Sequence, residues 1–162
     1  MPTVDQAIDE FLSQKRIAVA GVSRNAGGAH ASNGIYSRFK ERGYEVFAVN
    51  PKTDEVEGDR CYPNLAAIPG GVDAVLLATH PEVAAEVVRE CGELGIGRVW
   101  MHRSFGQGSV SEEAVALCRE HGIRVIPGAC PMMYVQPVDV GHRCIRWVLG
   151  ITGGLPKPAG IL

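Results

Sequence analysis

One junction recurs three times along this chain, and it constrains the fold more than any other feature of the sequence. At Gly43, Gly95 and Gly122, a glycine follows the end of a predicted helix and precedes a β-branched, apolar stretch. A glycine just beyond the last helical turn adopts the left-handed conformation that other residues resist, so each helix ends there. Three returns from helix to strand predict βαβ units, and hence a parallel α/β sheet with helices on its faces.

The predicted strands are nearly continuous apolar runs, as expected when both faces of a sheet are covered. They span residues 17–20, 45–49, 74–78, 98–101 and 124–126. Longer amphipathic segments predict helices at residues 4–14, from about 32, 81–94, 111–121 and 138–149, with a short helical turn at 64–68.

The sequence pattern also predicts how two of these helices begin and where the domain ends. The helix over 81–94 begins with a proline and is expected to bury Val83, Val87 and Cys91. Residues 109–112 are interpreted as a capping box for the next helix. We interpret residues 1–150 as one domain and the Gly- and Pro-rich residues 151–162 as a loose tail.

Composition limits the classes of function. The chain of 162 residues is long enough for one buried core and too short for two ordinary domains. Its net charge of −2 does not indicate a basic surface for binding nucleic acid. No apolar run approaches the roughly 20 residues that span a bilayer. Five scattered cysteines without zinc-like spacing indicate reduced thiols, and the acidic start of the chain does not fit a signal peptide. We therefore expect a cytoplasmic protein without a metal site.

The loop after the first predicted strand has features of a phosphate-binding turn. Ligands of doubly wound sheets bind at the carboxyl ends of the strands, where the winding reverses. Here Gly21, Val22 and Ser23 lead to a helix that begins near Ser32 or Asn33. The glycine permits a tight turn, and the free N–H groups of the helix favour an anion. Because the loop is longer than the GxGxxG fingerprint, a merely structural turn is the alternative.

The end of the second predicted strand indicates which nucleotide the site would hold. An NAD-binding domain places Asp or Glu here, to accept hydrogen bonds from the ribose diol. This chain has Asn50, Pro51 and Lys52 instead. A missing carboxylate and an added cation favour a phosphorylated ribose, as in coenzyme A or NADP, over NAD. A solvated loop lysine is the alternative interpretation of Lys52.

Several short motifs occur in an order and spacing that resemble a known family. They are Gly21-Val22-Ser23, Val49-Asn50-Pro51, Tyr62-Pro63-Asn64-Leu65, Val72-Asp73-Ala74-Val75, Val99-Trp100-Met101 and Cys130-Pro131. Together they resemble the small bacterial CoA-binding proteins, which are stand-alone relatives of the CoA-binding domain of the succinyl-CoA synthetase alpha subunit. The resemblance covers about residues 11–134. It implies a Rossmann-like, doubly wound, five-stranded parallel sheet of order 3-2-1-4-5 with coenzyme A lying across the strand ends.

The residue pattern and the resemblance together nominate the ligand-binding residues. These all lie at or just after the predicted strand ends: Gly21, Val22, Ser23, Ser32, Asn50, Pro51, Lys52, Thr79, His80, Pro81, Met101 and His102. On the analogy, the first three line the phosphate turn, and Lys52 approaches the ribose phosphate. The ligand is expected to be free coenzyme A or an acyl-CoA.

The predicted function is CoA binding without chemistry of its own, as a carrier, sensor or regulatory module. The alternative is an NADP- or NAD-binding oxidoreductase or redox-responsive regulator. The synthetase also needs a domain with a phosphorylated histidine, for which this sequence leaves no room, so an intact acyl-CoA ligase is not expected. Besides the small-molecule ligand, a second copy of the chain or an acyl-CoA enzyme is left open as a partner.

Three residues invite chemical roles that the sequence leaves open. If Cys130 faces bound CoA, its thiol and the CoA thiol would be joined in a mixed disulfide when an oxidant takes up the two electrons; a buried turn cysteine is the alternative. His102, at a strand end, is either a residue of the ligand cleft or a structural histidine. His142 is interpreted as a satisfied or surface histidine.

Overall fold

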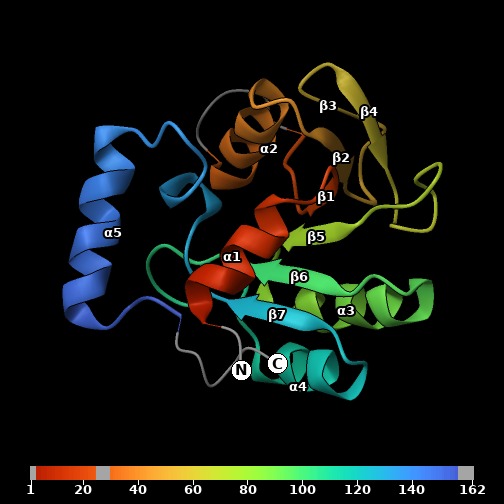
Figure 1. Cartoon of the computed structure of the whole chain (residues 1–162). Coiled ribbons are helices and arrows are strands. Elements are labelled where there is room, and N and C mark those ends of the chain that lie inside the picture. Colours follow the sequence, from red (N-terminus) through yellow and green to blue (C-terminus); the bar gives the residue numbers. More distant parts are fainter. Residues whose placement is uncertain (1–2, 25–29, 157–162) are drawn as a thin grey trace.

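The computed structural model describes residues 3–24 and 30–156 and contains one seven-stranded sheet (Figure 1). The strand order is β3-β4-β2-β1-β5-β6-β7. All neighbours are parallel except the terminal pair β3–β4. The strands are β1 (Arg16–Ala20), β2 (Glu45–Val49), β3 (Glu55–Val56), β4 (Asp59–Tyr62), β5 (Ala74–Leu77), β6 (Arg98–Met101) and β7 (Arg124–Pro127).

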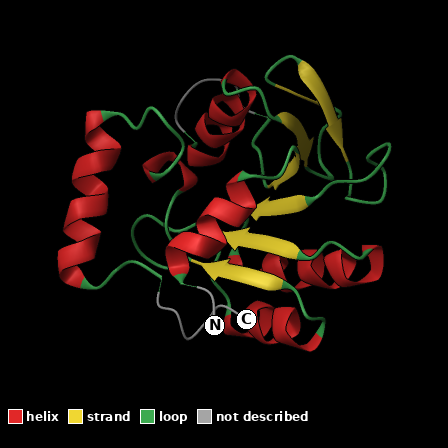
Figure 2. Cartoon of the chain, in the orientation of Figure 1, coloured by secondary structure: helices red, strands yellow, loops and turns green. Residues whose placement is uncertain are grey.

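Helices cover both faces of this sheet, as predicted (Figures 1 and 2). One buried cluster joins α1 and α2 to the sheet, and a second joins α3 and α4 to its other face. The helices are α1 (Val4–Leu12), α2 (Ala31–Glu41), α3 (Pro81–Leu94), α4 (Glu112–Glu120) and α5 (Val140–Thr152), with a single 3₁₀ turn η1 (Pro131–Met133). Residues 64–68 form turns instead of the predicted helical turn. Within the described parts of the chain, no helix has the length and apolar character that crossing a membrane requires.

The predicted strand number and order are wrong because an edge hairpin, β3–β4, adds two strands. The five predicted strands are β1, β2, β5, β6 and β7, but β4 takes the place beside β2. The third predicted strand, β5, instead pairs with β1 on its other side. The apolar pattern of the sequence does not predict the hairpin, because β3 has two residues and the four residues of β4 are mostly polar and only partly buried.

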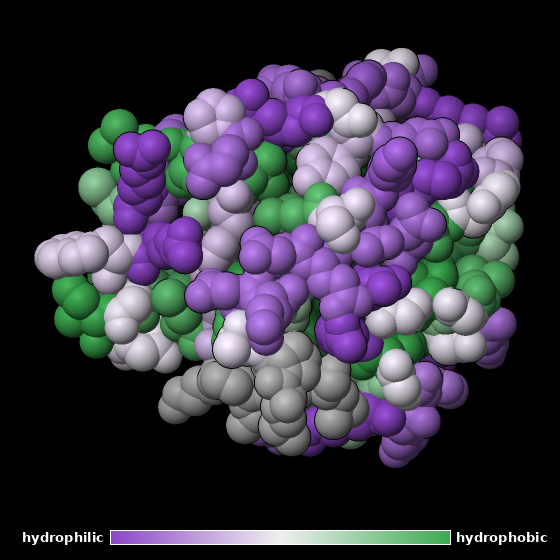
Figure 3. Space-filling view, in the orientation of Figure 1, coloured by the Kyte–Doolittle hydropathy of each residue, from purple (hydrophilic) through white to green (hydrophobic). Residues whose placement is uncertain are grey.

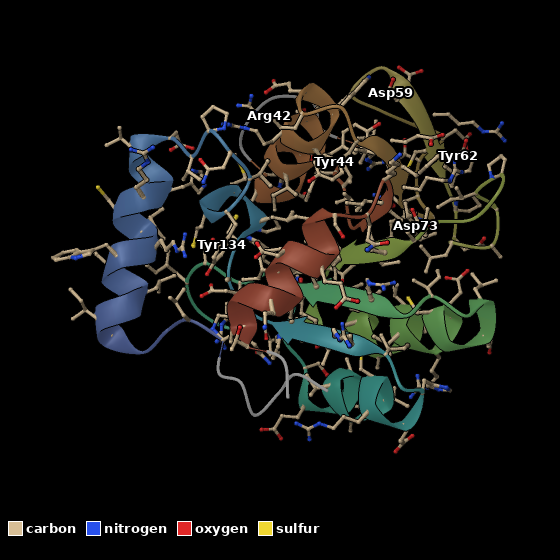
Figure 4. The ribbon with its side chains drawn as sticks, in the orientation of Figure 1. Arg42, Tyr44, Asp59, Tyr62, Asp73 and Tyr134 are labelled. Carbon is tan, nitrogen blue, oxygen red and sulfur yellow. The ribbon has the colours of Figure 1, made fainter. Side chains whose placement is uncertain are left out.

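The edge hairpin is tied to helix α2 by polar contacts. The Tyr36 hydroxyl, on α2, donates to a carboxylate oxygen of Asp59 at 2.7 Å. The Lys40 ammonium, one helical turn further on, forms an ion pair with the same carboxylate. These two contacts hold the pKa of Asp59 below its usual value. Figure 4 shows Asp59 beside α2. The hairpin therefore supports the helix whose first turn borders the candidate site.

The three glycine junctions form as predicted. Gly43, Gly95 and Gly122 have φ angles of +84°, +71° and +64°, all in the left-handed region. Each lies between the end of a helix and the start of a strand. The conformational preference of glycine therefore ends α2, α3 and α4 at the expected places.

Helix α3 packs on the sheet through a different face from the predicted one. It buries Ala84, Ala85 and Val88, together with Cys91, which was expected. Val83 is 41% exposed, so the predicted burial of Val83 is wrong. Val87 is partly buried and packs against the same core, so of the three predicted residues only Val83 is turned outward.

Helix α4 begins one residue later than predicted. Ser111 caps the helix by accepting a hydrogen bond from the Ala114 N–H. Ser109 is not part of the cap, because its hydroxyl donates to the Thr79 carbonyl at 2.7 Å. The predicted capping box over 109–112 is therefore replaced by a single serine cap.

Helix α5 stands beside the sheet and contacts the rest of the chain through η1 and Tyr134 (Figures 1 and 4). The Arg146 guanidinium lies over the Tyr134 ring, 4.3 Å from its centroid. The same tyrosine packs against Trp100, the largest fully buried side chain of the core. The helix continues to Thr152 and ends at Gly153, which is left-handed.

Candidate functional site

A cleft of about 930 Å³ opens at the carboxyl ends of the central strands. Its walls come from the segments that follow β1, β2, β4, β5 and β6, and from α3. The chain passes from β1 to α2 on one face of the sheet and from β5 to α3 on the other face. The gap between these adjacent strands is the topological switch point, where doubly wound sheets bind their ligands.

The structure brings most of the predicted site residues together around this cleft. Nine of the twelve line it: Gly21, Ser23, Ser32, Asn50, Pro51, Lys52, Thr79, His80 and His102. The other three do not. Val22 and Met101 are fully buried, because side chains alternate in direction along an extended chain. Pro81 occupies the first helical position of α3 and does not line the cleft. That the nine residues contact a ligand stays a prediction.

Gly21 permits a crossing of two chain segments at the floor of the cleft. Its φ is +95°, and its N–H donates to the Val49 carbonyl at 3.0 Å. A Cβ atom at this position would lie only 2.5 Å from the Ala78 carbonyl oxygen. Glycine is required here because the end of β5 passes directly against the turn after β1.

Asn33 clamps the turn after β1, and the sequence analysis did not assign it to the site. Its side chain is 2% exposed. Its Oδ1 accepts from the Ser23 N–H and its Nδ2 donates to the Ser23 carbonyl, both at 2.9 Å. The same Nδ2 donates to the Glu57 carboxylate at 2.7 Å, and Glu57 has a left-handed φ of +52°. The edge hairpin thus holds the asparagine that fixes the turn.

We expect Asn33→Ala to lower the free energy of unfolding by about 1–3 kcal/mol, because it removes buried hydrogen bonds. Urea denaturation measures this loss. A second variant, Asn33→Asp, keeps the acceptor but places a carboxylate beside Glu57, so it should be less destabilising in a Glu57→Gln background. Equal effects of Asn33→Asp in both backgrounds would contradict the clamp.

Both polar atoms of the Asn50 side chain form hydrogen bonds within the protein. Its Nδ2 donates to the Val22 carbonyl at 2.9 Å, and its Oδ1 accepts from the Lys52 N–H at 2.9 Å. Asn50 therefore shapes the turn that presents Pro51 and Lys52. Lys52 is exposed at the wall of the cleft.

The segment after β5 carries an unsatisfied polar atom. The Thr79 Oγ1 is buried, and it is the one buried side-chain nitrogen or oxygen without a hydrogen-bond partner among the described residues. Its backbone is fixed by Ser109, whose hydroxyl donates to the Thr79 carbonyl and whose N–H donates to the His102 carbonyl. A buried hydroxyl without a partner is uncommon in folded proteins, and this one belongs to a residue that lines the cleft.

His102 lies at the end of β6, in the wall of the cleft, with its Nε2 3.4 Å from the Ser104 hydroxyl. Burial lowers the pKa of His102 below its usual value of 6.5. The imidazole is therefore held neutral in the folded protein at a pH where the unfolded chain already takes up a proton.

This shift gives a pH dependence of stability. A lowered histidine pKa contributes stability above the unfolded pKa, and the contribution is lost as the pH falls below 6.5. We expect His102→Gln to remove this component, so the free energy of unfolding of the variant should decline less steeply below pH 6.5. Urea unfolding on both sides of that pH measures it. Parallel curves for variant and parent would show that His102 is not desolvated.

The cleft also includes residues that the sequence analysis missed. Pro63 and Asn64 enter it from the segment after β4, and the outward side of α3 supplies Val83, Glu86, Val87, Glu90 and Glu93. The available signal was a second apolar stripe on this helix, since Val83 and Val87 are spaced by one turn and neither is fully buried.

Cys130 and His142 lie outside the lining of the cleft. Cys130 is 2% exposed, and burial raises the pKa of its thiol. Both facts disfavour a mixed disulfide with a ligand, because exchange requires an accessible thiolate. The His142 Nδ1 lies 2.6 Å from the carboxylate of Asp139, the residue that caps α5. This histidine is satisfied within its own helix turn, as interpreted from the sequence.

The sheet topology and the cleft at its switch point define a Rossmann-like nucleotide-binding domain. The CoA binding domain family matches residues 15–136. The chain belongs to this family, which confirms the resemblance inferred from the motifs.

Related proteins fall into two groups by size. The uncharacterized protein YneT of Bacillus subtilis is 33% identical over 124 residues, which cover 76% of this chain and 87% of YneT. A hypothetical protein from Pyrococcus horikoshii superimposes with a TM-score of 0.75 at 27% identity, covering 85% of this chain and 92% of that one. The ADP-forming acetate–CoA ligase II of Archaeoglobus fulgidus is 32% identical over 124 residues, or 72% of this chain. The match spans only 18% of that ligase, so the chain corresponds to a small part of it.

Proposed function

We propose that this chain binds coenzyme A or an acyl-CoA in the cleft, as a carrier, sensor or regulatory module without catalysis of its own. The observation that carries the proposal is the coincidence of family and geometry: the matched segment ends at residue 136 and contains every residue that lines the cleft. The family favours CoA over NAD or NADP as the nucleotide.

Charge supports one orientation of the ligand. The first turn of α2, including Ser32, faces the cleft next to the Gly21–Ser23 turn, and the N-terminal N–H groups of a helix attract phosphate. Lys52 adds a cation nearby. Glu86, Glu90 and Glu93 line the part of the cleft along α3, where an anion would be repelled. We therefore place the pyrophosphate at α2, the ribose phosphate at Lys52, and uncharged parts of the ligand along α3.

The size and surface of the cleft support a ligand of this kind. A volume of about 930 Å³ lies at the upper end of the range for small-molecule and cofactor sites, which is about 300–1,000 Å³. Val83, Val87 and Pro63 supply apolar surface, and Ser23, Asn64 and Lys52 supply polar groups. Coenzyme A combines an aromatic base, charged phosphates and a long uncharged arm, so it uses all of these features.

Calorimetric titration of the purified, reduced protein with CoA, dephospho-CoA, NAD and NADP tests the proposal. We expect saturable binding of CoA that weakens when the 3′-phosphate is absent, and much weaker binding of NAD. Preferential binding of NADP or NAD would move the protein to the redox class. Absence of CoA binding would refute the proposal.

A further inference from the structure

Helix α5 carries an apolar face that no described residue covers. Val140, Trp147 and Ile151 are 75%, 69% and 67% exposed, and Cys144 and Val148 are exposed beside them. Figure 3 shows apolar atoms gathered over α5 at the left edge of the molecule. We call these five residues the α5 outer face. The other side of the helix already packs on the core through Ile145 and Leu149. A helix that is apolar on two sides is built to pack against two partners.

The spacing of the outer face is that of a helix-packing seam. Val140, Cys144, Trp147 and Ile151 follow one another at intervals of four, three and four residues. This alternation is the a/d repeat by which one helix inserts its side chains between those of another. The face therefore fits a second helix better than a flat or irregular surface.

The seam is complementary to itself when two copies run antiparallel. The point halfway along the helix between Val140 and Ile151 is also halfway between Cys144 and Trp147. It falls between Ile145 and Arg146. A two-fold axis at that midpoint places Val140 level with Ile151 of the other copy. It also places the small Cys144 level with the large Trp147. All four seam positions are then filled in one register.

The helix dipoles favour this arrangement, whereas the side-chain charges of α5 do not. Helix α5 contains no carboxylate, and in the antiparallel register Arg143 lies level with Val148 of the other copy. Arg146 is already engaged by the Tyr134 ring. Each helix N-terminus lies beside the C-terminus of its neighbour, so the helix dipoles attract. The seam is about 20 Å long for 13 residues, which is short for a standard interface.

We propose that two copies of this chain dimerise through their α5 outer faces, packed antiparallel about a two-fold axis at the midpoint of the helix. The short seam gives a reversible dimer with a dissociation constant of about micromolar order. This proposal is independent of the ligand, because α5 lies outside the cleft and beyond the segment matched by the family.

Sedimentation velocity over a range of protein concentrations tests the dimer. We expect a monomer–dimer equilibrium that Ile151→Asp weakens at least about tenfold, because a carboxylate would be buried in the seam. The matched control is Leu94→Asp, which also replaces an exposed apolar residue in the last turn of a helix, here α3. A parent protein that stays monomeric, or a dimer that Ile151→Asp does not weaken, would overturn the proposal.

Disulfide trapping tests the direction of packing. In the antiparallel register, Trp147→Cys places the new thiol level with Cys144 of the other copy, and oxidation should give a covalent dimer linked between positions 144 and 147. The parent should not crosslink through Cys144 alone, because the two Cys144 are offset along the helices by three residues, or about 4.5 Å. Adding Cys144→Ser should abolish the crosslink. A direct Cys144–Cys144 link in the parent, or no 144–147 link at dimer-forming concentrations, would overturn the antiparallel register.

Discussion

Replacing Gly21 with alanine is expected to lower the free energy of unfolding by about 3 kcal/mol and to abolish measurable CoA binding. The new Cβ would meet the Ala78 carbonyl oxygen at 2.5 Å and its carbon at 2.7 Å, which is closer than such contacts can be. Relief requires the turn after β1 or the end of β5 to move. Both segments line the cleft, so stability and binding should fall together.

The control for this prediction is Gly43→Ala. Gly43 has a similar φ, +84°, but a Cβ there would meet nothing within 4 Å. Its substitution should cost only the left-handed strain of about 1–2 kcal/mol and leave CoA binding intact. Urea denaturation and calorimetric titration of both variants measure the two effects. Similar losses in the two variants would show that the close approach at Gly21 has no special importance.

Charge reversal at Lys52 is expected to have the largest effect on binding alone. Lys52→Glu should weaken CoA by about 10- to 100-fold, because a carboxylate would replace the cation placed beside the ribose phosphate. Dephospho-CoA should be affected much less, since it lacks that phosphate. Lys52 is exposed and its side chain is not part of the core, so the free energy of unfolding should change little.

The matched control is Lys15→Glu, which changes the net charge equally. Lys15 is exposed just before β1, at the amino edge of the sheet and therefore far from the cleft. Calorimetry with CoA and dephospho-CoA on both variants separates a local contact from the general field of the protein. Unchanged CoA affinity in Lys52→Glu, or equal weakening of both ligands, would refute the placement of the ribose phosphate.

The gathering of most predicted site residues around one cleft has a topological reason. Residues that directly follow parallel strands meet at one edge of a sheet whatever the strand order. Thr79 and His102 therefore lie in the cleft although the predicted strand order was wrong. Val22 and Met101 were assigned to the site by sequence proximity alone, and the alternation of side chains along the backbone directs them into the core instead.

The residues that the sequence analysis missed depend on contacts between distant segments. In the sequence, Asn33 is an ordinary residue near the start of a helix. Its role becomes clear only from its hydrogen bonds to Ser23 and Glu57 in the structure. The outward side of α3 joins the cleft because Ala84, Ala85 and Val88 face the sheet, which leaves Val83 on the other side of the helix. Neither fact leaves a local signal strong enough to choose between the two faces of the helix.

The sequence by itself determined the α/β class, the three helix ends at glycine, the order of the main helices and strands along the chain and the loops that line the cleft. These depend on conformational preference and on the period of apolar residues, which act over a few neighbours. Only the tertiary structure decided the edge hairpin β3–β4, the clamp on Ser23, the orientation of α3 and the uncovered outer face of α5. Those features depend on which distant segments pack together, and packing selects among local conformations that the sequence alone leaves nearly equal.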